Sequence, residues 1–182
     1  MRYSDGALSA MLADPACRFD IQPLLHQPEG CTVDLTLDNQ FRKQRTLGQI
    51  VDSTVTEDEL YYPTVTAASV VMEPGDILLG ITKERVVIPD NCVGWLDGRS
   101  SLARRGLFIH VTAGRIDPGF EGQIVLEFYN ASPNTLRLDT GMRIGALSLE
   151  ALEAVAQQPY RARDTAKYRG QAGVIGSRTS ED

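Results

Sequence analysis

Several segments of the chain carry side chains that could bind a phosphorylated ligand or move a proton. Residues 97–104 read Asp-Gly-Arg-Ser-Ser-Leu-Ala-Arg, which predicts a glycine turn that enters a short helix. Free backbone N–H groups at such a turn, with serine and arginine side chains beside them, suit phosphate oxygens. A plain capped helix with exposed arginines would have the same sequence, so this segment alone leaves both interpretations open.

Asp117 lies in a second segment, residues 113–122, which also contains Glu121, three glycines and a proline. This density of glycine and proline predicts a tight, sterically open loop. The Asp117 carboxylate could accept a sugar hydroxyl or organise a water molecule. Asp-Pro-Gly is also favourable chemistry for a type I turn, so a purely structural Asp117 is the competing interpretation.

Glu127 lies in the middle of a predicted strand, residues 123–129. Alternation places it on the same face as Val125 and Tyr129, while the apolar residues between them point to the other face. If the Glu127 face lines a pocket, loss of hydration raises the carboxyl pKa and makes the group a proton carrier near neutral pH. A glutamate facing solvent from a half-exposed strand is the alternative.

The C-terminal segment combines basic, aromatic and amide side chains. They include Tyr160, Arg161, Arg163, Lys167, Tyr168, Arg169 and Gln171. Such a segment suits a flap that closes over an anionic ligand and excludes water, although a basic tail that only adds surface charge would look the same. Residues 161–182 are polar and contain glycine, so we expect them to pack little by themselves.

Short strands punctuated by glycine and proline must position these groups. We predict strands over residues 31–37, 77–82, 85–88, 93–96, 107–112, 123–129, 135–138 and 142–149. Short strands spaced by about ten residues favour an all-β sandwich or barrel. Helical patterns are confined to a stretch that Ser4 could cap and to residues 100–105, and the weakly patterned residues 44–68 predict a long excursion.

The composition fits one domain with a buried core and an acidic surface. The chain has 182 residues, 42% of them hydrophobic, and a net charge of −6, which disfavours nucleic acid as a partner. Residues 1–98 hold 7 basic and 15 acidic side chains, whereas residues 99–178 hold 11 basic and 7 acidic ones. A localised anion site in the second half would explain this imbalance, as would unequal solvated faces.

The cysteines and the N-terminus indicate a cytoplasmic protein. Cys17, Cys31 and Cys92 are widely spaced and include no Cys-x-x-Cys pair, so we expect neither a disulfide framework nor a zinc site. The N-terminal residues lack the basic and then apolar order of a signal peptide. No run of about 18 apolar residues occurs, so no membrane partner is expected.

Together these segments resemble the dCTP deaminase family, a branch of the trimeric dUTPase superfamily. The resemblance runs through residues 93–104 (Val-Gly-Trp-Leu-Asp-Gly-Arg-Ser-Ser-Leu-Ala-Arg), 110–113, 116–119, 125–130, 141–147 and 166–171. It implies an all-β fold, mainly β with a few short helices, arranged as a distorted dUTPase-like β-barrel. It also implies one domain over residues 1–182, with 161–182 a flexible flap over the active site, and a homotrimer whose active sites lie between subunits.

The resemblance implies hydrolytic deamination of dCTP to dUTP and ammonia, with Mg²⁺ on the triphosphate rather than on side chains, and without zinc. Zinc-dependent cytosine deaminases require His-x-Glu and Pro-Cys-x-x-Cys. Here His26 is followed by Gln-Pro, His110 by Val-Thr, and no cysteine pair occurs. Protein groups alone would therefore activate the water. By the same resemblance dTTP is a candidate feedback inhibitor.

Residue roles follow from the same resemblance. Glu127 would carry protons from the attacking water to the ring nitrogen and the leaving amine. Ser100 and the carbonyl of Ala113 would position that water against carbon 4 of cytosine, and Arg104 would stabilise charge nearby. Asp117 would accept the deoxyribose 3'-hydroxyl. The substrate-binding residues implied in this way are Arg99, Ser100, Ser101, Leu102, Ala103, Arg104, Asp117, Val125, Leu126, Glu127, Tyr160, Lys167 and Gln171.

Gly114 leaves the final product open. Many deaminases that release dUTP have histidine at this position, whereas bifunctional relatives, which continue to dUMP and pyrophosphate, often have glycine followed by an aromatic residue. Here Arg115 follows Gly114, which is similar to the single-function group. The alternatives are therefore a bifunctional deaminase and diphosphatase and, less favoured, a regulator on the same fold that binds nucleotides without turnover.

Overall fold

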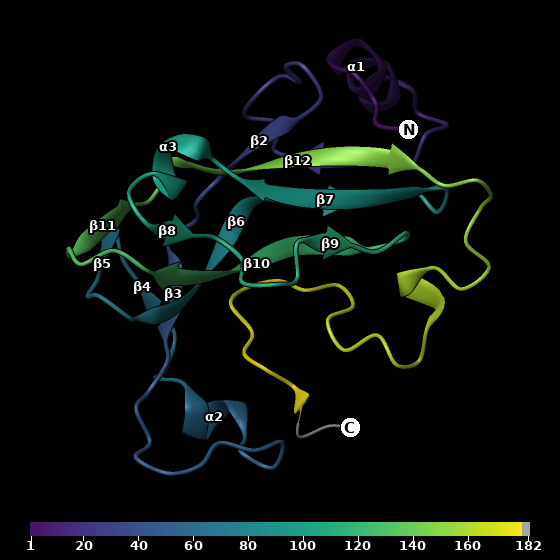
Figure 1. Cartoon of the computed structure of the whole chain (residues 1–182). Helices are drawn as coiled ribbons and strands as arrows, with labels where there is room; N and C mark the ends of the chain where they lie inside the picture. Colours follow the sequence, from purple (N-terminus) through teal and green to yellow (C-terminus); the bar gives the residue numbers. More distant parts are fainter. Residues whose placement is uncertain (180–182) are drawn as a thin grey trace.

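The computed structural model describes residues 1–179, and strands make up most of its regular structure (Figure 1). The strands are β1 Asp20–Gln22, β2 Val33–Thr36, β3 Gln40–Lys43, β4 Val65–Thr66, β5 Ser69–Met72, β6 Ile77–Val87, β7 Cys92–Gly98, β8 Leu107–Phe108, β9 Arg115–Ile116, β10 Glu121–Asn130, β11 Leu136–Asp139 and β12 Arg143–Ala151. The helices are α1 Asp5–Ala13, α2 Glu57–Leu60, α3 Ser100–Ala103 and a 3₁₀ turn, Tyr160–Ala162. The predicted fold class, all-β with a few short helices, is confirmed.

Antiparallel pairing arranges the described strands into two larger sheets and a small one. The first runs β4-β3-β6-β10-β8, with β1 also paired to β6, and the second runs β2-β12-β7-β9. The small sheet pairs β11 with β5. Apolar side chains from both larger sheets fill the core, where Leu35, Leu126, Phe128 and Ile144 are fully buried. No helix in residues 1–179 is long and apolar enough to cross a membrane.

The β6–β10 pair positions most of the cavity described below. The two strands predicted over residues 77–82 and 85–88 form the single strand β6. Near the predicted break, the pairing of β6 with β10 is irregular between Gln123 and Val125. Here Thr82 Oγ accepts a hydrogen bond from Ile124 N at 2.9 Å. Glu84 stays buried because its carboxylate accepts from Thr36 N at 2.9 Å.

Three local predictions differ from the structure. Ser4 occupies the N-cap position of α1, but its side chain makes no capping hydrogen bond. Instead the Asp5 carboxylate accepts from Gly6 N at 2.8 Å. The strand predicted over residues 107–112 is limited to β8, Leu107–Phe108. The excursion over residues 44–68 contains α2, whose start is fixed by a capping box between Thr56 and Glu59.

The C-terminal segment packs on the sheet, contrary to our expectation that it would pack little. Gln171 and Val174 are each only 7% exposed. Gln123 N donates to Gln171 O at 2.9 Å, and Gln171 Nε2 donates to Gln123 O at 2.9 Å. The irregular β10 backbone at Gln123 therefore supplies a docking point. No apolar periodicity marks this segment, because the attachment uses backbone groups and an amide.

Gly122 lets the C-terminal segment approach this closely. A Cβ atom on Gly122 would lie 2.8 Å from Gln171 O and 3.0 Å from Gln171 N, and the φ of Gly122 is +157°. We expect Gly122→Ala to loosen residues 171–173 and to lower the free energy of unfolding by about 1–3 kcal/mol. Amide hydrogen exchange of Gly173 should accelerate, and denaturant unfolding should show the loss of stability.

Gly6→Ala is the matched control, because a Cβ on Gly6 meets no atom within 4 Å. Its exchange in residues 171–173 should match that of the wild type. Equal protection of Gly173 in the Gly122 variant and the wild type would contradict this account of the close approach.

Candidate active site

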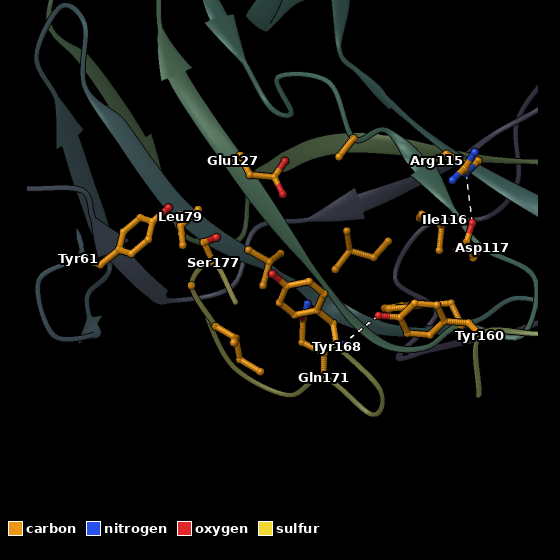
Figure 2. A pocket seen from close by; sticks show the side chains of 16 residues that line it. Tyr61, Leu79, Arg115, Ile116, Asp117, Glu127, Tyr160, Tyr168, Gln171 and Ser177 are labelled. Atoms are coloured by element: carbon orange, nitrogen blue, oxygen red, sulfur yellow. Dashed lines mark hydrogen bonds and ion pairs between the residues drawn. The ribbon is translucent and has the colours of Figure 1, made fainter. Parts of the chain in front are cut away.

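A cavity of about 460 Å³ lies between β6, β10 and the C-terminal segment (Figure 2). Strands supply its wall on one side, and residues after α2 and after Pro159 supply the other. Its lining residues are Tyr61, Leu79, Ala113, Arg115, Ile116, Asp117, Phe120, Ile124, Val125, Glu127, Tyr160, Tyr168, Gln171, Ile175, Gly176 and Ser177. A volume of this order suits a small-molecule ligand.

Several predicted site residues from distant parts of the sequence meet in this cavity. They are Ala113, Asp117, Val125, Glu127, Tyr160 and Gln171. Two of them come from β10, two from the glycine-rich segment around β9, and two from the C-terminal segment. The fold therefore places these residues around one space, while the role of each stays a prediction.

Glu127 projects from β10 into the cavity (Figure 2). The predicted alternation is confirmed, because Leu126 and Phe128 are fully buried on the other face. Burial raises the pKa of the Glu127 carboxyl from its ordinary 4.5 to about 7. Of the two readings left open by the sequence, the pocket-facing one is correct, and the group can exchange a proton near neutral pH.

Asp117 both starts a turn and faces the cavity. Its carbonyl accepts from Phe120 N at 3.1 Å, and Gly119 at the third turn position has a φ of +76°, which makes the turn type II rather than the expected type I. Arg115 Nε lies 3.1 Å from Oδ1 and Arg163 Nη2 lies 2.5 Å from Oδ2. The two cations fix the carboxylate, and its remaining lone pairs can still accept a hydroxyl.

The C-terminal segment covers the side of the cavity that the strands leave open. The ring of Tyr160 packs on Phe120 with centroids 5.8 Å apart, and its hydroxyl accepts from Tyr168 N at 2.9 Å. Lys167, which we expected at the ligand, is not among the lining residues, and its Nζ donates to Arg178 O at 2.9 Å. Arg178 Nη1 donates back to Lys167 O at 2.6 Å, so these two residues close residues 167–178 into a loop.

The segment around α3 does not line this cavity within a single chain. The side chains of Ser100, Ser101, Ala103 and Arg104 are exposed on the outside of the fold. Leu102 packs against the core, and Arg99 pairs with Asp34 on β2. The physical reason is topological, because α3 follows β7 in the sheet that does not carry Glu127. The short predicted helix itself is confirmed.

The side chain of Leu126, a residue that we expect to border the base, points away from the cavity. Leu126 is fully buried, and the strand alternation that turns Glu127 into the cavity turns Leu126 into the core. Any contact of Leu126 with a ligand would therefore be made by its backbone.

Three hydroxyl groups line the cavity near Glu127, and of these only Tyr168 was indicated by the sequence. Tyr61 and Ser177 lie on the same side of the cavity as Glu127, and Tyr168 lies below it (Figure 2). Burial, and then the charge of Glu127, raise the pKa of Tyr61. Tyr168 stood out as an aromatic residue in a basic segment, but Tyr61 follows a weakly patterned stretch and carried no signal.

The donor atoms in the cavity do not form a metal site of their own. Within residues 1–179, no group of three or more His, Cys, Asp or Glu side chains could hold a metal ion. Asp117 is one carboxylate already paired with two arginines. Because Mg²⁺ in nucleotide sites is commonly held by one or two carboxylates and the substrate phosphates, this donor set fits an ion that arrives with a triphosphate.

Comparison with known proteins identifies the family. The family model described as dCTP deaminase-like matches residues 4–152. Curated dCTP deaminases from Alteromonas mediterranea and Pectobacterium atrosepticum are each 44% identical, over alignments that cover 100% of this chain and 98% and 100% of theirs. The solved 2'-deoxycytidine 5'-triphosphate deaminase from Agrobacterium tumefaciens has a TM-score of 0.64 at 20% identity and covers 82% of this chain.

This solved structure supports the fold alone, since the identity is low and the chain spans 48% of that protein. The sequence matches extend over the strands and loops that build the cavity, including β6, β10 and the segment around Asp117. The family resemblance expected from the sequence is therefore confirmed, and the chain belongs to the dCTP deaminase-like family.

Proposed function

We propose that the protein catalyses the hydrolytic deamination of dCTP to dUTP and ammonia. The observation that carries the proposal is Glu127, a carboxyl group whose pKa burial raises to about 7 inside a cavity large enough for part of a nucleotide. The names of the two relatives that are 44% identical over the whole chain support the same reaction.

The chemistry needs one group that takes a proton and gives it back. Water adds to carbon 4 of cytosine as it loses a proton, and the amine leaves with an added proton as the carbon–nitrogen bond breaks. With a pKa of about 7, Glu127 is present in both protonation states near neutral pH. It can take the first proton from the water and pass it to the ring nitrogen, and then take the hydroxyl proton of the tetrahedral intermediate and pass it to the leaving amine. The Ala113 carbonyl, at the cavity wall, would orient the water.

The distribution of positive charge supports a site shared between subunits. Arg115 is the only basic residue among the described lining residues, and it already pairs with Asp117. A bound triphosphate needs further donors, and α3 exposes Ser100, Ser101 and Arg104 away from its own cavity. We therefore propose a homotrimer in which α3 of one subunit, with Arg99 before it, completes the cavity of the next.

The remaining contacts are proposed on the same basis. Asp117 would accept the deoxyribose 3'-hydroxyl, and Val125 and the Leu126 backbone would border the base. Tyr160, Lys167 and Gln171 would close the C-terminal segment over the nucleotide. Mg²⁺ would neutralise triphosphate charge. Feedback by dTTP and a cytoplasmic location remain predictions.

Packing alone accounts for a glycine at position 114. This residue therefore does not decide whether the product is dUTP or dUMP. A Cβ at this position would lie 2.9 Å from His110 Cε1 and 3.0 Å from Leu96 O. Any larger residue would therefore displace His110 or the backbone. The bifunctional route to dUMP and pyrophosphate stays the second candidate, because glycine is also the residue that the resemblance associates with bifunctional relatives.

Incubation of the purified protein with dCTP and Mg²⁺ should release ammonia and dUTP, and Glu127→Gln should reduce turnover by at least about 100-fold while dCTP still binds. Glutamine preserves the shape of the side chain and removes the proton carrier. Ammonia release and chromatography of the nucleotides give both readouts. Pyrophosphate that appears in step with dUMP would instead support the bifunctional enzyme.

Glu121→Gln on the same strand is the control, because Glu121 pairs with Arg85 outside the cavity. Its turnover should stay within about twofold of wild type. A loss below about tenfold in the Glu127 variant would remove Glu127 from the central role.

The pH dependence of stability should also reveal Glu127. Between pH 4.5 and about 7 the folded protein keeps a proton that the unfolded chain releases, so this group reduces stability as the pH rises through that window. Glu127→Gln does not titrate. The variant should therefore gain stability relative to wild type between pH 5 and pH 8 in denaturant titrations at one protein concentration, whereas a constant difference would refute the raised pKa.

Mixing two inactive variants tests the shared site. Arg104→Ala and Glu127→Gln damage opposite sides of the proposed interface, so each alone should be nearly inactive. Trimers assembled at random from equal amounts should recover activity in about one site in four, because some sites then combine both intact residues. Mixed trimers without any recovered activity would contradict the shared site.

A further inference from the structure

The excursion over residues 44–68, to which the reaction assigns no role, joins the cavity to the C-terminal segment. Leu60 and Tyr61 from this excursion pack with Leu79 and Ile81 of β6 and with Val174 of the C-terminal segment. This second apolar cluster lies behind the end of the cavity that holds Glu127. The excursion therefore stabilises one wall of the site.

Arg42 on β3 is a buried cation held in one place by the excursion. Its side chain is 7% exposed. Nε donates to Tyr62 O at 3.1 Å, Nη1 lies 3.1 Å from Glu57 Oε2, and Nη2 lies 2.9 Å from Asp58 Oδ1. Because each guanidinium nitrogen has an oxygen partner, Arg42 fixes the position of the Glu57 carboxylate.

Glu57 in turn binds the C-terminal segment. Its Oε2 accepts a hydrogen bond from Gly176 N at 2.6 Å. A Cβ atom on Gly176 would lie 2.7 Å from the same oxygen and 3.1 Å from Tyr61 Cδ2, so the backbone passes directly against α2 and Tyr61. Gly176 and its two neighbours, Ile175 and Ser177, line the cavity.

Strand register relates this contact to Glu127. Arg42 pairs with Leu79 on β6, and Leu79 pairs with Glu127 on β10. Arg42 and Glu127 thus lie two strand spacings apart, about 10 Å, with Leu79 between them. Glu57 and Asp58 neutralise Arg42, so the nearby cation does not offset the loss of hydration that Glu127 undergoes.

We propose that Glu57, held by Arg42, is a positioning residue that fixes residues 174–177 against α2 and closes the Glu127 end of the cavity to water. We call the contact between Arg42, Glu57 and Gly176 the latch. Its part in turnover rests on the function proposed above, but its effect on Glu127 is a property of the free protein. Glu57 acts through the C-terminal segment and touches no reacting atom.

Other titratable groups face Glu127 across the cavity and must be considered in any pH experiment. Tyr61 comes from the residue after α2, Arg115 and Asp117 from the region of β9, and Tyr160 and Tyr168 from the C-terminal segment. Of these, Tyr61 carries a raised pKa because of its burial and the charge of Glu127. None of the latch variants below substitutes any of these five residues.

The test compares two variants. Glu57→Ala removes the latch, whereas Asp58→Asn removes a negative charge beside Arg42 but keeps the hydrogen bond from Gly176 to Glu57. Two readouts on the full-length protein without ligand are used: hydrogen exchange of the Gly176 amide and the carboxyl titration of Glu127 by NMR. In Glu57→Ala, Gly176 exchange should accelerate by about tenfold or more and the Glu127 pKa should fall toward its ordinary value. Asp58→Asn should leave Gly176 exchange close to wild type and should shift the Glu127 titration by less than Glu57→Ala does.

Two further variants keep the test decisive if Glu57→Ala does not fold. Glu57→Gln retains an oxygen for Gly176 but loses the ion pair, so an intermediate effect is expected. Gly176→Ala separates the backbone from Glu57 without a change of charge and should shift both readouts in the same direction as Glu57→Ala. With dCTP, loss of the latch should raise KM and move the pH–rate profile of kcat to lower pH.

Unchanged Gly176 exchange and unchanged Glu127 titration in the Glu57 and Gly176 variants would overturn the latch. An Asp58→Asn shift as large as that of Glu57→Ala would overturn it as well, since the charge on Arg42 would then be the cause. Failure of the wild type to release ammonia from dCTP would refute the proposed function instead, while both ligand-free readouts would still decide the latch.

Discussion

The dehydration of one carboxyl group, Glu127, is the constraint on which the arrangement of the cavity depends. A carboxylate in the middle of a strand is ordinarily hydrated, and reducing its hydration requires neighbouring groups on several sides. Here β6 covers it from the neighbouring strand, Tyr61 from the excursion, and Ile175 to Ser177 from the C-terminal segment. These covering elements come from widely separated parts of the sequence, so the chemistry of one group depends on much of the fold.

The exposed arginine of the α3 segment and the Glu127 carboxyl lie in different parts of one chain. The sheet with β6 and β10 holds Glu127, the proposed proton carrier, whereas the exposed serines and arginine of α3 follow β7 in the other large sheet. Asp117 lies between these regions, on the turn after β9, and two arginines fix its carboxylate. In the homotrimer that we propose, such a division would give association between subunits a direct effect on catalysis, because neither half-site would be complete by itself.

The elements with regular patterns could be predicted, and the contacts between distant segments could not. Alternation along β10 predicted that Glu127 and Leu126 point to opposite faces, and the structure places Leu126 in the core. The docking of Gln171 on Gln123 was not predictable, because it uses backbone groups at an irregular pairing of β6 with β10. Tyr61 and Glu57 carried no signal, because their roles depend on the fold bringing a polar excursion beside the end of the chain.

The docked C-terminal segment also determines where the protein tolerates modification. Met1 is almost fully exposed, and Figure 1 shows the N-terminus beside α1, on the opposite side of the molecule from α2. The C-terminal segment, in contrast, ends its described part next to the cavity wall, after Lys167 and Arg178 have tied it into a closed loop. An affinity tag or a fluorophore at the exposed N-terminus therefore leaves that loop intact, whereas a bulky group attached near Ser177 would lie beside the cavity that Glu127 lines.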